Sequence, residues 1–220
     1  ALGPDYDVEK HFTPTYNPWD QRMCLIPNGD LFVSINKGRA SVVTDEIVCF
    51  TESGIQLKSG EILEADIIVT ATGLNLVSLG EIDVLVDGQA VDFSQTWTYK
   101  GLAYSDVPNL VSTFGYINAS WTLRADVVAN YTCRLLNKMK STGTQQATPR
   151  LRAQDQNMTP RPWINDFSAG YMERMMHLMP KQGDHAPWIN PQLIAVDKQM
   201  IVKPPIDDGA MQFSKVKTSA

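Results

Sequence analysis

A strongly apolar run is followed by residues that could lie close to a bound cofactor. Residues 67–69 are Ile-Ile-Val, the continuous pattern of a strand that is buried on both faces. The run leads into Ala71, Thr72 and Gly73, and a small residue followed by glycine allows the backbone to turn sharply beside a bound group. This stretch therefore predicts a strand and a turn that contacts a cofactor.

A second glycine precedes the clearest helix pattern in the sequence. Gly115 follows residues 109–113, which we expect to form a short strand. Apolar residues then recur at helical spacing over residues 123–139, and Asn118 or Ser120 can cap the helix. A strand, a glycine and a helix N-terminus in this order direct backbone N–H groups toward an anionic or electron-rich ring edge. The same pattern also fits an ordinary capped helix.

Short elements are expected before residue 66. Residues 31–37 are compatible with a helix that is capped by Asn28 or Asp30 and ended by Gly38. The Glu-Ser-Gly triplet at residues 52–54 is typical of a hairpin turn. Strand signals occupy four short runs, at residues 40–44, 47–51, 55–58 and 62–63.

Later in the chain the patterns are weaker. Residues 82–100 alternate as strand material around an Asp-Gly turn. Residues 141–163 are polar and interrupted by proline, so we expect a surface loop there. A shorter helix is expected around residues 168–178, and little regular structure from Pro180 onward.

Composition excludes several classes of protein. The 220 residues carry a net charge of −5, which argues against a nucleic-acid binder. No apolar run approaches 18 residues, so we expect no membrane span, and we see no signal peptide. The three cysteines show no paired or metal-like spacing, which favours reduced thiols and a cytoplasmic location. The three histidines share no ligand spacing, so we expect no metal site.

These motifs together resemble the class B flavoprotein monooxygenases of the Baeyer–Villiger type. Residues 66–73 are similar to the D-x-x-x-x-A-T-G signature that links the NADPH domain to the FAD domain, and residues 108–115 resemble the P-N-L/M-x-x-x-x-G stretch that returns to the flavin. Residues 16–22 stand where the family has its P-x-G-x-K-R segment, with Asp-Gln in place of the glycine-containing step and lysine. Over nearly the whole chain, the likeness is greatest to the actinobacterial branch that includes the ethionamide-activating monooxygenase.

The resemblance implies roles for individual residues. Arg22 matches the catalytic arginine, whose guanidinium is suited to stabilising a peroxide anion, although an ion pair with Asp20 is the plain alternative. Trp19, Tyr116 and Trp121 are candidates for the substrate wall, with ordinary core packing as the alternative. Implied contacts with the cofactors are Asp66, Ala71, Thr72, Gly73, Asn109, Gly115, Asn118, Ala119 and Ser120.

The resemblance also implies a fold and a reaction. We expect an α/β fold, the C-terminal portion of a flavoprotein with two Rossmann-like dinucleotide-binding domains for FAD and NADPH. Residues 1–73 would end the NADPH-binding domain with a β-hairpin insert, residues 74–145 would close the FAD-binding domain, and residues 146–220 would form a C-terminal tail of loops and a helix. The implied enzyme uses NADPH and O2 to insert one oxygen atom into apolar ketones, or to oxidise sulfides or thioamides, through a C4a-peroxyflavin.

No G-x-G-x-x-G turn for either nucleotide occurs in these 220 residues. We therefore expect an N-terminal half of the same enzyme to be the partner that holds the nucleotides. Two alternatives stay open at this point. One is a fragment without activity of its own, and the other is a different two-domain flavoprotein, such as a pyridine-nucleotide disulfide reductase.

Overall fold

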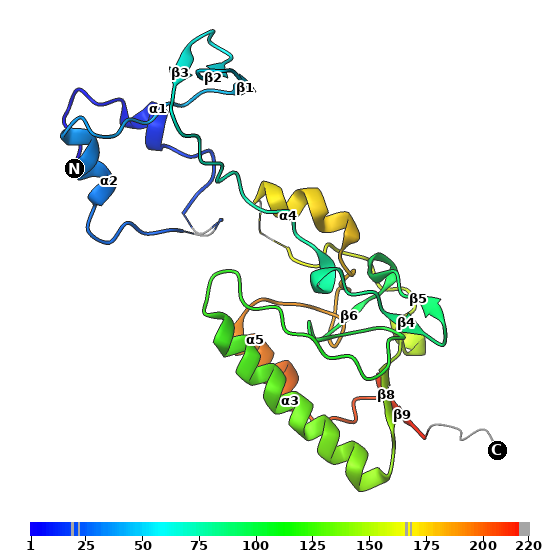
Figure 1. The fold of residues 1–220 in the computed structure, drawn as a ribbon. Coiled ribbons are helices and arrows are strands. Elements are labelled where there is room, and N and C mark those ends of the chain that lie inside the picture. The colour runs from blue at the N-terminus through cyan, green and yellow to red at the C-terminus, as the bar shows by residue number, and fades with distance from the viewer. Residues whose placement is uncertain (19, 22, 166, 168, 216–220) are drawn as a thin grey trace. The chain divides into compact units, whose positions relative to one another are not determined.

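The computed structural model describes residues 1–18, 20, 21, 23–165, 167 and 169–215. The chain divides into two compact units, Ala1–Gly73 and Leu74–Ala220, which are described separately (Figure 1). The division falls at the glycine where the sequence analysis places its first domain boundary. Both units combine helices with antiparallel β-structure, so the fold is mixed α/β.

The first unit is built from short local elements. It contains α1 (Val8–Phe12), α2 (Asp30–Asn36) and an antiparallel sheet of β1 (Ile47–Phe50), β2 (Gly54–Leu57) and β3 (Ile62–Glu64). The expected helix and the expected hairpin are thus confirmed. The cap of α2 differs from the expectation, because Gly29 in a left-handed conformation occupies that position and no side chain caps the helix.

Two strands that we expected in the first unit are absent. Residues 40–44 and 67–69 form no strand, and the side chains of Ile67 and Val69 are each 82% exposed. The prediction of a strand buried on both faces is therefore wrong for the described chain. The physical reason is that a strand needs neighbours for its backbone N–H and C=O groups, and no described segment pairs with residues 67–69.

The second unit is organised around α3 (Trp121–Thr142), the helix that the apolar spacing predicts. Ser120 precedes the helix in an extended conformation, and Gly143 ends it with φ of +65°. The buried face of α3 includes Val127, Tyr131 and Leu135, which pack into the main hydrophobic core. The expected face is only partly buried, since Leu123 and Leu136 remain exposed.

Short elements complete the second unit. The small hairpins are β4 (Leu85–Val86) with β5 (Gln89–Ala90), around the expected Asp-Gly turn, and β6 (Thr98–Tyr99) with β7 (Ala103–Tyr104). The expected helix near residue 170 is confirmed as α4 (Gly170–Met175). The 3₁₀ helices are η1 (Ser78–Glu81), η2 (Phe93–Gln95), η3 (Ala153–Asp155) and η4 (Met176–Leu178).

The tail is more ordered than its sequence indicates. Within the range expected to be a surface loop, β8 (Gln146–Pro149) is largely buried and pairs antiparallel with β9 (Met211–Ser214). The helix α5 (Ile194–Asp197) and the π-helical turn η5 (Lys198–Val202) pack along α3 (Figure 1). These pairings join residues far apart in the sequence, and local patterns do not report them.

The short strand expected at residues 109–113 is also absent. The backbone N–H of Asn109 donates to the carbonyl of Ala147, and the N–H of Ser112 donates to the carbonyl of Leu102. This segment therefore bonds to two different parts of the tail and core instead of to one neighbouring strand. It still runs directly into Gly115 and the start of α3.

The buried carboxylate of Asp155 connects two turns of the tail through hydrogen bonds. Asp155 is fully buried, and its carboxylate accepts hydrogen bonds from Arg152 Nε at 2.7 Å and is paired with His185 Nε2 at 3.0 Å. Burial alone acts to raise the pKa of Asp155, but hydrogen bonds from Arg152 and His185 outweigh it, so the net shift of that pKa is downward. The other ring nitrogen of His185 lies 2.6 Å from Asp184.

This arrangement predicts a pH-dependent contribution of His185 to stability. Its hydrogen bonds to Asp155 and then to Asp184 raise its pKa. The protonated form of His185 then stabilises the folded state. This contribution is fully present at pH values below the pKa of His185 in the unfolded chain, about 6.5, and it is lost as the pH rises through the pKa in the folded protein. The side chain of His185 is 43% exposed, so its contribution is small. At acidic pH we expect the free energy of unfolding of the native protein to exceed that of His185→Asn by at most about 1 kcal/mol.

The measurement is urea unfolding of both proteins at pH 5.5, 7.0 and 8.5. The difference in the free energy of unfolding should shrink across this series. A difference that stays constant with pH would show that His185 acts without its charge.

Candidate functional site

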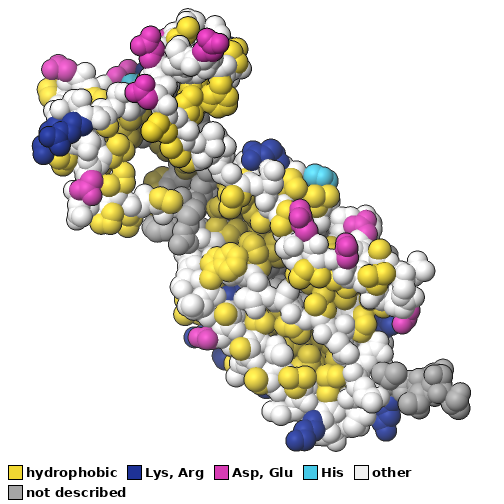
Figure 2. Space-filling view, in the orientation of Figure 1, with side chains coloured by type: hydrophobic (Ala, Val, Ile, Leu, Met, Phe, Trp, Pro, Cys, Tyr) yellow, Lys and Arg dark blue, Asp and Glu magenta, His cyan; other side chains and the backbone are white. Residues whose placement is uncertain are grey.

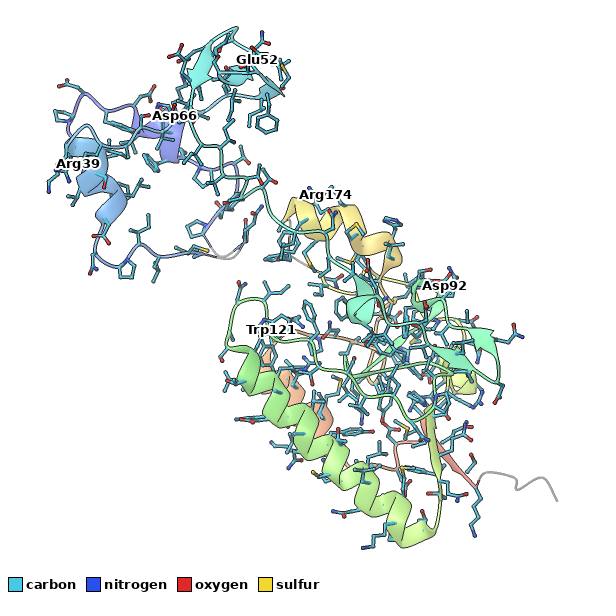
Figure 3. All side chains as sticks on the ribbon, viewed as in Figure 1. Arg39, Glu52, Asp66, Asp92, Trp121 and Arg174 are labelled. Carbon is cyan, nitrogen blue, oxygen red and sulfur yellow. The ribbon has the colours of Figure 1, made fainter. Side chains whose placement is uncertain are left out.

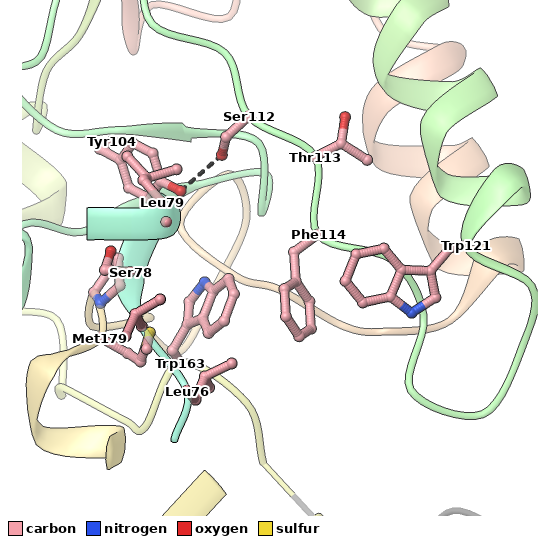
Figure 4. A pocket seen from close by; sticks show the side chains of 13 residues that line it. Leu76, Ser78, Leu79, Tyr104, Ser112, Thr113, Phe114, Trp121, Trp163 and Met179 are labelled. Atoms are coloured by element: carbon pink, nitrogen blue, oxygen red, sulfur yellow. Dashed lines mark hydrogen bonds between the residues drawn. The ribbon is translucent and has the colours of Figure 1, made fainter. Parts of the chain in front are cut away.

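The second unit contains a partly enclosed cavity of about 240 Å³ near the start of α3 (Figure 4). Its walls come from the segment after Gly73, from the segment before α3, and from the tail. The lining is mainly apolar and aromatic, as in most small-molecule sites. The lining residues are Leu76, Val77, Ser78, Leu79, Gly80, Tyr104, Ser112, Thr113, Phe114, Trp121, Trp163, Met179 and Pro180.

Three aromatic rings form a row along one side of this cavity. The ring of Phe114 lies between the indoles of Trp121 and Trp163, at centroid distances of 5.1 and 4.6 Å (Figure 4). The interplanar angles of 53° and 62° are those of tilted and edge-on contacts, which aromatic pairs prefer. Trp121 is the first residue of α3 (Figure 3), and 55% of it is exposed. The row therefore connects the interior to an accessible edge.

The polar side chains among the lining residues are the hydroxyl groups of Ser78, Tyr104, Ser112 and Thr113 and the indole of Trp163. The hydroxyls of Tyr104 and Ser112 lie 2.7 Å apart and satisfy each other. Burial raises the pKa of Tyr104, so its phenol stays neutral through the physiological range. The indole Nε1 of Trp163 is buried, and it has no hydrogen-bond partner among the described residues.

The start of α3 is open to a ligand. The side chain of Ser120, at the N-cap, accepts no hydrogen bond from a backbone N–H of the first turn, and its hydroxyl lies 2.7 Å from the hydroxyl of Thr122 instead. The first backbone N–H groups of the helix therefore lack a side-chain cap, and they carry the positive end of the helix dipole. Asn118 and Ser120 are exposed and Ala119 is half-buried. An electron-rich or anionic group can therefore approach this end of the helix.

Gly115 is required by the aromatic row. A Cβ atom at this position would lie 2.1 Å from Cγ of Trp121 and 2.2 Å from its Cδ2. Any side chain would therefore displace the indole. The sequence points to this glycine for a turn near a cofactor, and the structure adds its contact with Trp121.

Tyr116 has a supporting position in the structure. Its side chain is 1% exposed and does not line the cavity. The hydroxyl donates to Asp197 at 2.5 Å, and Arg124 pairs with the same carboxylate oxygen at 2.5 Å. Burial raises the pKa of Tyr116, and its bond to the Asp197 carboxylate raises it further. This buried group joins the start of α3 to α5 in the tail.

The other expected site residues are placed as follows. Asp66, Ala71, Thr72 and Gly73 are exposed in the first unit, and no described atom lies within 4 Å of a Cβ built on Gly73. In the second unit Asn109 is bound to its own chain, since its side chain accepts from the N–H of Ala147 and donates to the carbonyl of Gln145. Trp19 and Arg22 lie outside the described residues.

Sequence reasoning missed most of the cavity wall. Phe114 and Trp163 were not among the expected site residues, and neither was the segment at residues 76–80. Trp163 lies in a range that we expected to be a surface loop. A tryptophan in such a loop was the one available signal, because large aromatic side chains are usually buried.

Two further properties of the described residues bear on function. None of their helices combines the length and the hydrophobicity that crossing a lipid bilayer requires. Among them, no three His, Cys, Asp or Glu side chains are arranged to hold a metal ion.

Comparison with known proteins finds clear sequence relatives. The chain is 49% identical over 214 residues to the FAD-containing monooxygenase EthA of Mycolicibacterium smegmatis, covering 97% of this chain and 43% of that protein. It is 48% identical to EthA of Mycobacterium tuberculosis, with the same coverage. It is also 48% identical over 206 residues to the "Probable FAD-binding monooxygenase AlmA" of Acinetobacter baylyi, covering 94% of this chain and 41% of that protein.

The chain thus spans less than half the length of these relatives. No family model and no solved structure matches it.

Proposed function

This chain is a relative of the FAD-containing monooxygenases over nearly its whole length, and from that premise we propose that it forms part of the flavin pocket of such an enzyme. The enzyme would depend on FAD and NADPH and would insert one atom of O2 into ketones or oxidise sulfur compounds. Supplied with these cofactors, the reaction would convert a ketone, O2, NADPH and a proton into an ester, NADP⁺ and water. The sequence analysis predicts a resemblance to flavoprotein monooxygenases, and the relatives named above confirm that resemblance.

One observation carries this proposal, namely the uncapped start of α3 beside the aromatic row. Backbone N–H groups at a helix N-terminus that no side chain caps can donate to the polar, electron-rich edge of a flavin ring. The small side chain of Ala119 leaves room for close approach, Gly115 leaves room for the indole of Trp121, and Asn118 and Ser120 add exposed polar side chains. We propose that these residues contact FAD. The donor set fits one edge of the group and does not include a glycine-rich loop for its diphosphate.

The remaining expected residues keep proposed roles. Trp121 and Phe114 would exclude water from the reacting centre and hold an apolar substrate against it. Arg22 and Trp19 keep the catalytic and substrate-lining roles that the resemblance implies. Tyr116 would act by positioning the start of α3, given its bond to Asp197. Asp66, residues 71–73 and Asn109 would contact the nucleotides or hold the segments that do.

The first unit supports the proposal that it is part of a larger domain. Leu57 is the one buried hydrophobic side chain among its described residues. Ile47, Val48 and Phe50 on β1 are 56–60% exposed, and hydrophobic side chains are visible on the surface (Figure 2). Exposed apolar surface on this scale is typical of a surface that another polypeptide segment covers.

We propose that the covering segments are the N-terminal half of the same enzyme. Residues 1–73 would then complete the NADPH domain, residues 74–145 would close the FAD domain, and residues 146–220 would form the tail. We propose a cytoplasmic location and no activity for this chain without the other half.

The proposal predicts that Gly115→Ala weakens FAD binding in the complete protein about tenfold or more, because the new methyl group displaces Trp121 from the flavin pocket. The measurement is the amount of FAD retained per chain, from flavin absorbance and from titration of the apoprotein. Gly170→Ala is the matched control, since its Cβ would meet only the end of the Arg174 side chain, at 3.3 Å.

Circular dichroism confirms that both variants are folded. FAD binding by Gly115→Ala equal to that of the control would remove the start of α3 from the flavin pocket. A complete protein that takes up no FAD at all would contradict the whole proposal.

A further inference from the structure

The loop that leads into α3 is attached to the tail at two neighbouring residues. The hydroxyl of Tyr116 donates to Asp197. The backbone N–H of Ile117 donates to the side-chain oxygen Oε1 of Gln192 at 3.0 Å. The first bond holds a side chain, whereas the second holds a peptide group directly. Residues 118–120, which we propose to contact FAD, follow that peptide at once.

The amide of Gln192 has only one orientation that satisfies its partners. A backbone N–H can only donate, so Ile117 requires the oxygen of the Gln192 amide, and the amide nitrogen then bonds elsewhere. Gln192 Nε2 donates to Asn190 Oδ1 at 3.2 Å. Asn190 Nδ2 in turn donates to the carbonyl of Trp163 at 3.2 Å. Both ends of this chain of hydrogen bonds are therefore backbone groups.

The side chains of Gln182, Asn190 and Gln192 form what we call the amide network. Gln182 Oε1 accepts from the backbone N–H of Asn190 at 2.9 Å, and Gln182 Nε2 donates to the carbonyls of Pro162 and Trp163 at 2.8 and 3.2 Å. Gln182 and Asn190 are each 3% exposed. The oxygen and the nitrogen of all three side-chain amides thus have partners, and a buried network that is fully paired specifies one arrangement. It connects the backbone of the cavity wall to the start of α3.

The backbone at Gln192 is strained. Its φ is +52°, a left-handed conformation that residues other than glycine, asparagine and aspartate rarely adopt. Such a conformation costs free energy, and it persists where the surrounding structure requires it, most often at functional sites. A glycine would adopt the same backbone without strain, but it has no side chain to reach Ile117. The strain therefore indicates that this position requires the side-chain amide.

We propose that Gln192 is a positioning residue of the flavin site. Through the amide network it holds the Ile117 peptide, and with it the uncapped start of α3, at a fixed place relative to the cavity wall at Trp163. The tail thereby takes part in cofactor binding, a role that the proposed function does not assign to it. The inference rests on the proposed function, because it requires that the start of α3 contacts FAD.

Gln192→Met in the complete protein tests this role. Methionine keeps the length of the side chain, and it removes the acceptor for Ile117 and the donor for Asn190. We expect FAD to bind about fivefold to tenfold more weakly, as measured by titration of the apoprotein. At saturating FAD the visible circular dichroism of the flavin should also change, because this signal reports the surroundings of the ring and not the stability of the fold.

A second variant at the same position keeps the test independent of folding. Gln192→Asn retains an amide and is better suited to a left-handed backbone. Its side chain is shorter by a methylene group, so it cannot bond to Ile117 and Asn190 together. It should therefore weaken FAD binding as Gln192→Met does. Full FAD affinity in either variant would overturn the proposal.

Gln199→Met is the matched control, because it makes the same change at an exposed glutamine of the tail, on η5. It should leave the FAD affinity and the visible circular dichroism unchanged. A loss of affinity as large as that of Gln192→Met would show that the amide network has no special role, and it would also overturn the proposal.

Hydrogen exchange, followed by mass spectrometry, gives a measurement that needs no FAD. In the apoprotein of Gln192→Met, residues 116–123 should exchange faster than in the unsubstituted apoprotein, whereas β8 should exchange at the same rate in both. Equal exchange of residues 116–123 in the two proteins would overturn the proposal. An unsubstituted protein that takes up no FAD contradicts the proposed function. A protein that binds FAD equally well with and without the Gln192 amide contradicts only the positioning role.

Discussion

Replacing Arg124 with methionine should lower the free energy of unfolding by about 3–5 kcal/mol, because it leaves the Asp197 carboxylate buried without its counter-charge. Both side chains are fully buried, and Arg124 Nη1 lies 2.5 Å from Asp197 Oδ2. Burial raises the pKa of Asp197, and the Arg124 charge opposes that shift. The guanidinium also donates to the carbonyl of Lys100 at 2.9 Å. The measurement is chemical unfolding of the complete protein, followed by circular dichroism.

The matched control is a surface ion pair of the same chemistry. Arg150 and Asp106 are 50% and 65% exposed, so Arg150→Met should cost about 0–1 kcal/mol. The double variant Arg124→Met, Asp197→Leu should recover much of the loss, because no unpaired charge then remains in the interior. If Arg124→Met lowers the free energy of unfolding no more than Arg150→Met does, the buried ion pair does not hold the tail on α3.

Replacing Arg22 with alanine should lower the yield of oxygenated product by about 100-fold to 1,000-fold, the range for loss of one stabilising donor at a developing anion. Arg22 lies outside the described residues, and this expectation rests on the position of the arginine in the sequence motif. NADPH should still bleach the flavin of the variant if hydride transfer survives. The measurements are flavin absorbance after NADPH addition and product yield by chromatography.

A control separates the role of Arg22 from a general loss of positive charge. Arg39 is an exposed arginine in the same unit, and Arg39→Ala should leave the product yield unchanged. Near-normal product from Arg22→Ala would remove this residue from the active site. A variant that no longer bleaches would assign Arg22 to NADPH binding or hydride transfer.

Local sequence patterns were sufficient for elements whose hydrogen bonds close within a few residues. The helix α3 follows from apolar spacing and ends at Gly143. The hairpin of β1 and β2 follows from its Glu-Ser-Gly turn. In both cases the partner groups are near in sequence, so the pattern that predicts the element also contains the residues that stabilise it.

The same patterns failed where the partner is distant. The strand expected at residues 67–69 has no pairing segment in the described chain, and its side chains are exposed. The strand β8 was read as a surface loop because its partner β9 begins more than 60 residues later. An apolar run shows that a segment is suited to burial, but only the rest of the fold decides what buries it.

The amino-acid sequence by itself determined the family likeness, the helix α3 and the glycine that precedes it. Only the tertiary structure decided that Phe114, Trp121 and Trp163 meet in one row. Their meeting depends on the tail folding back over α3, where the ion pair of Arg124 with Asp197 contributes to holding it. Trp163 lies more than 40 residues from Phe114 and Trp121 in the sequence, so its place beside Phe114 depends on long-range contacts that no local spacing encodes.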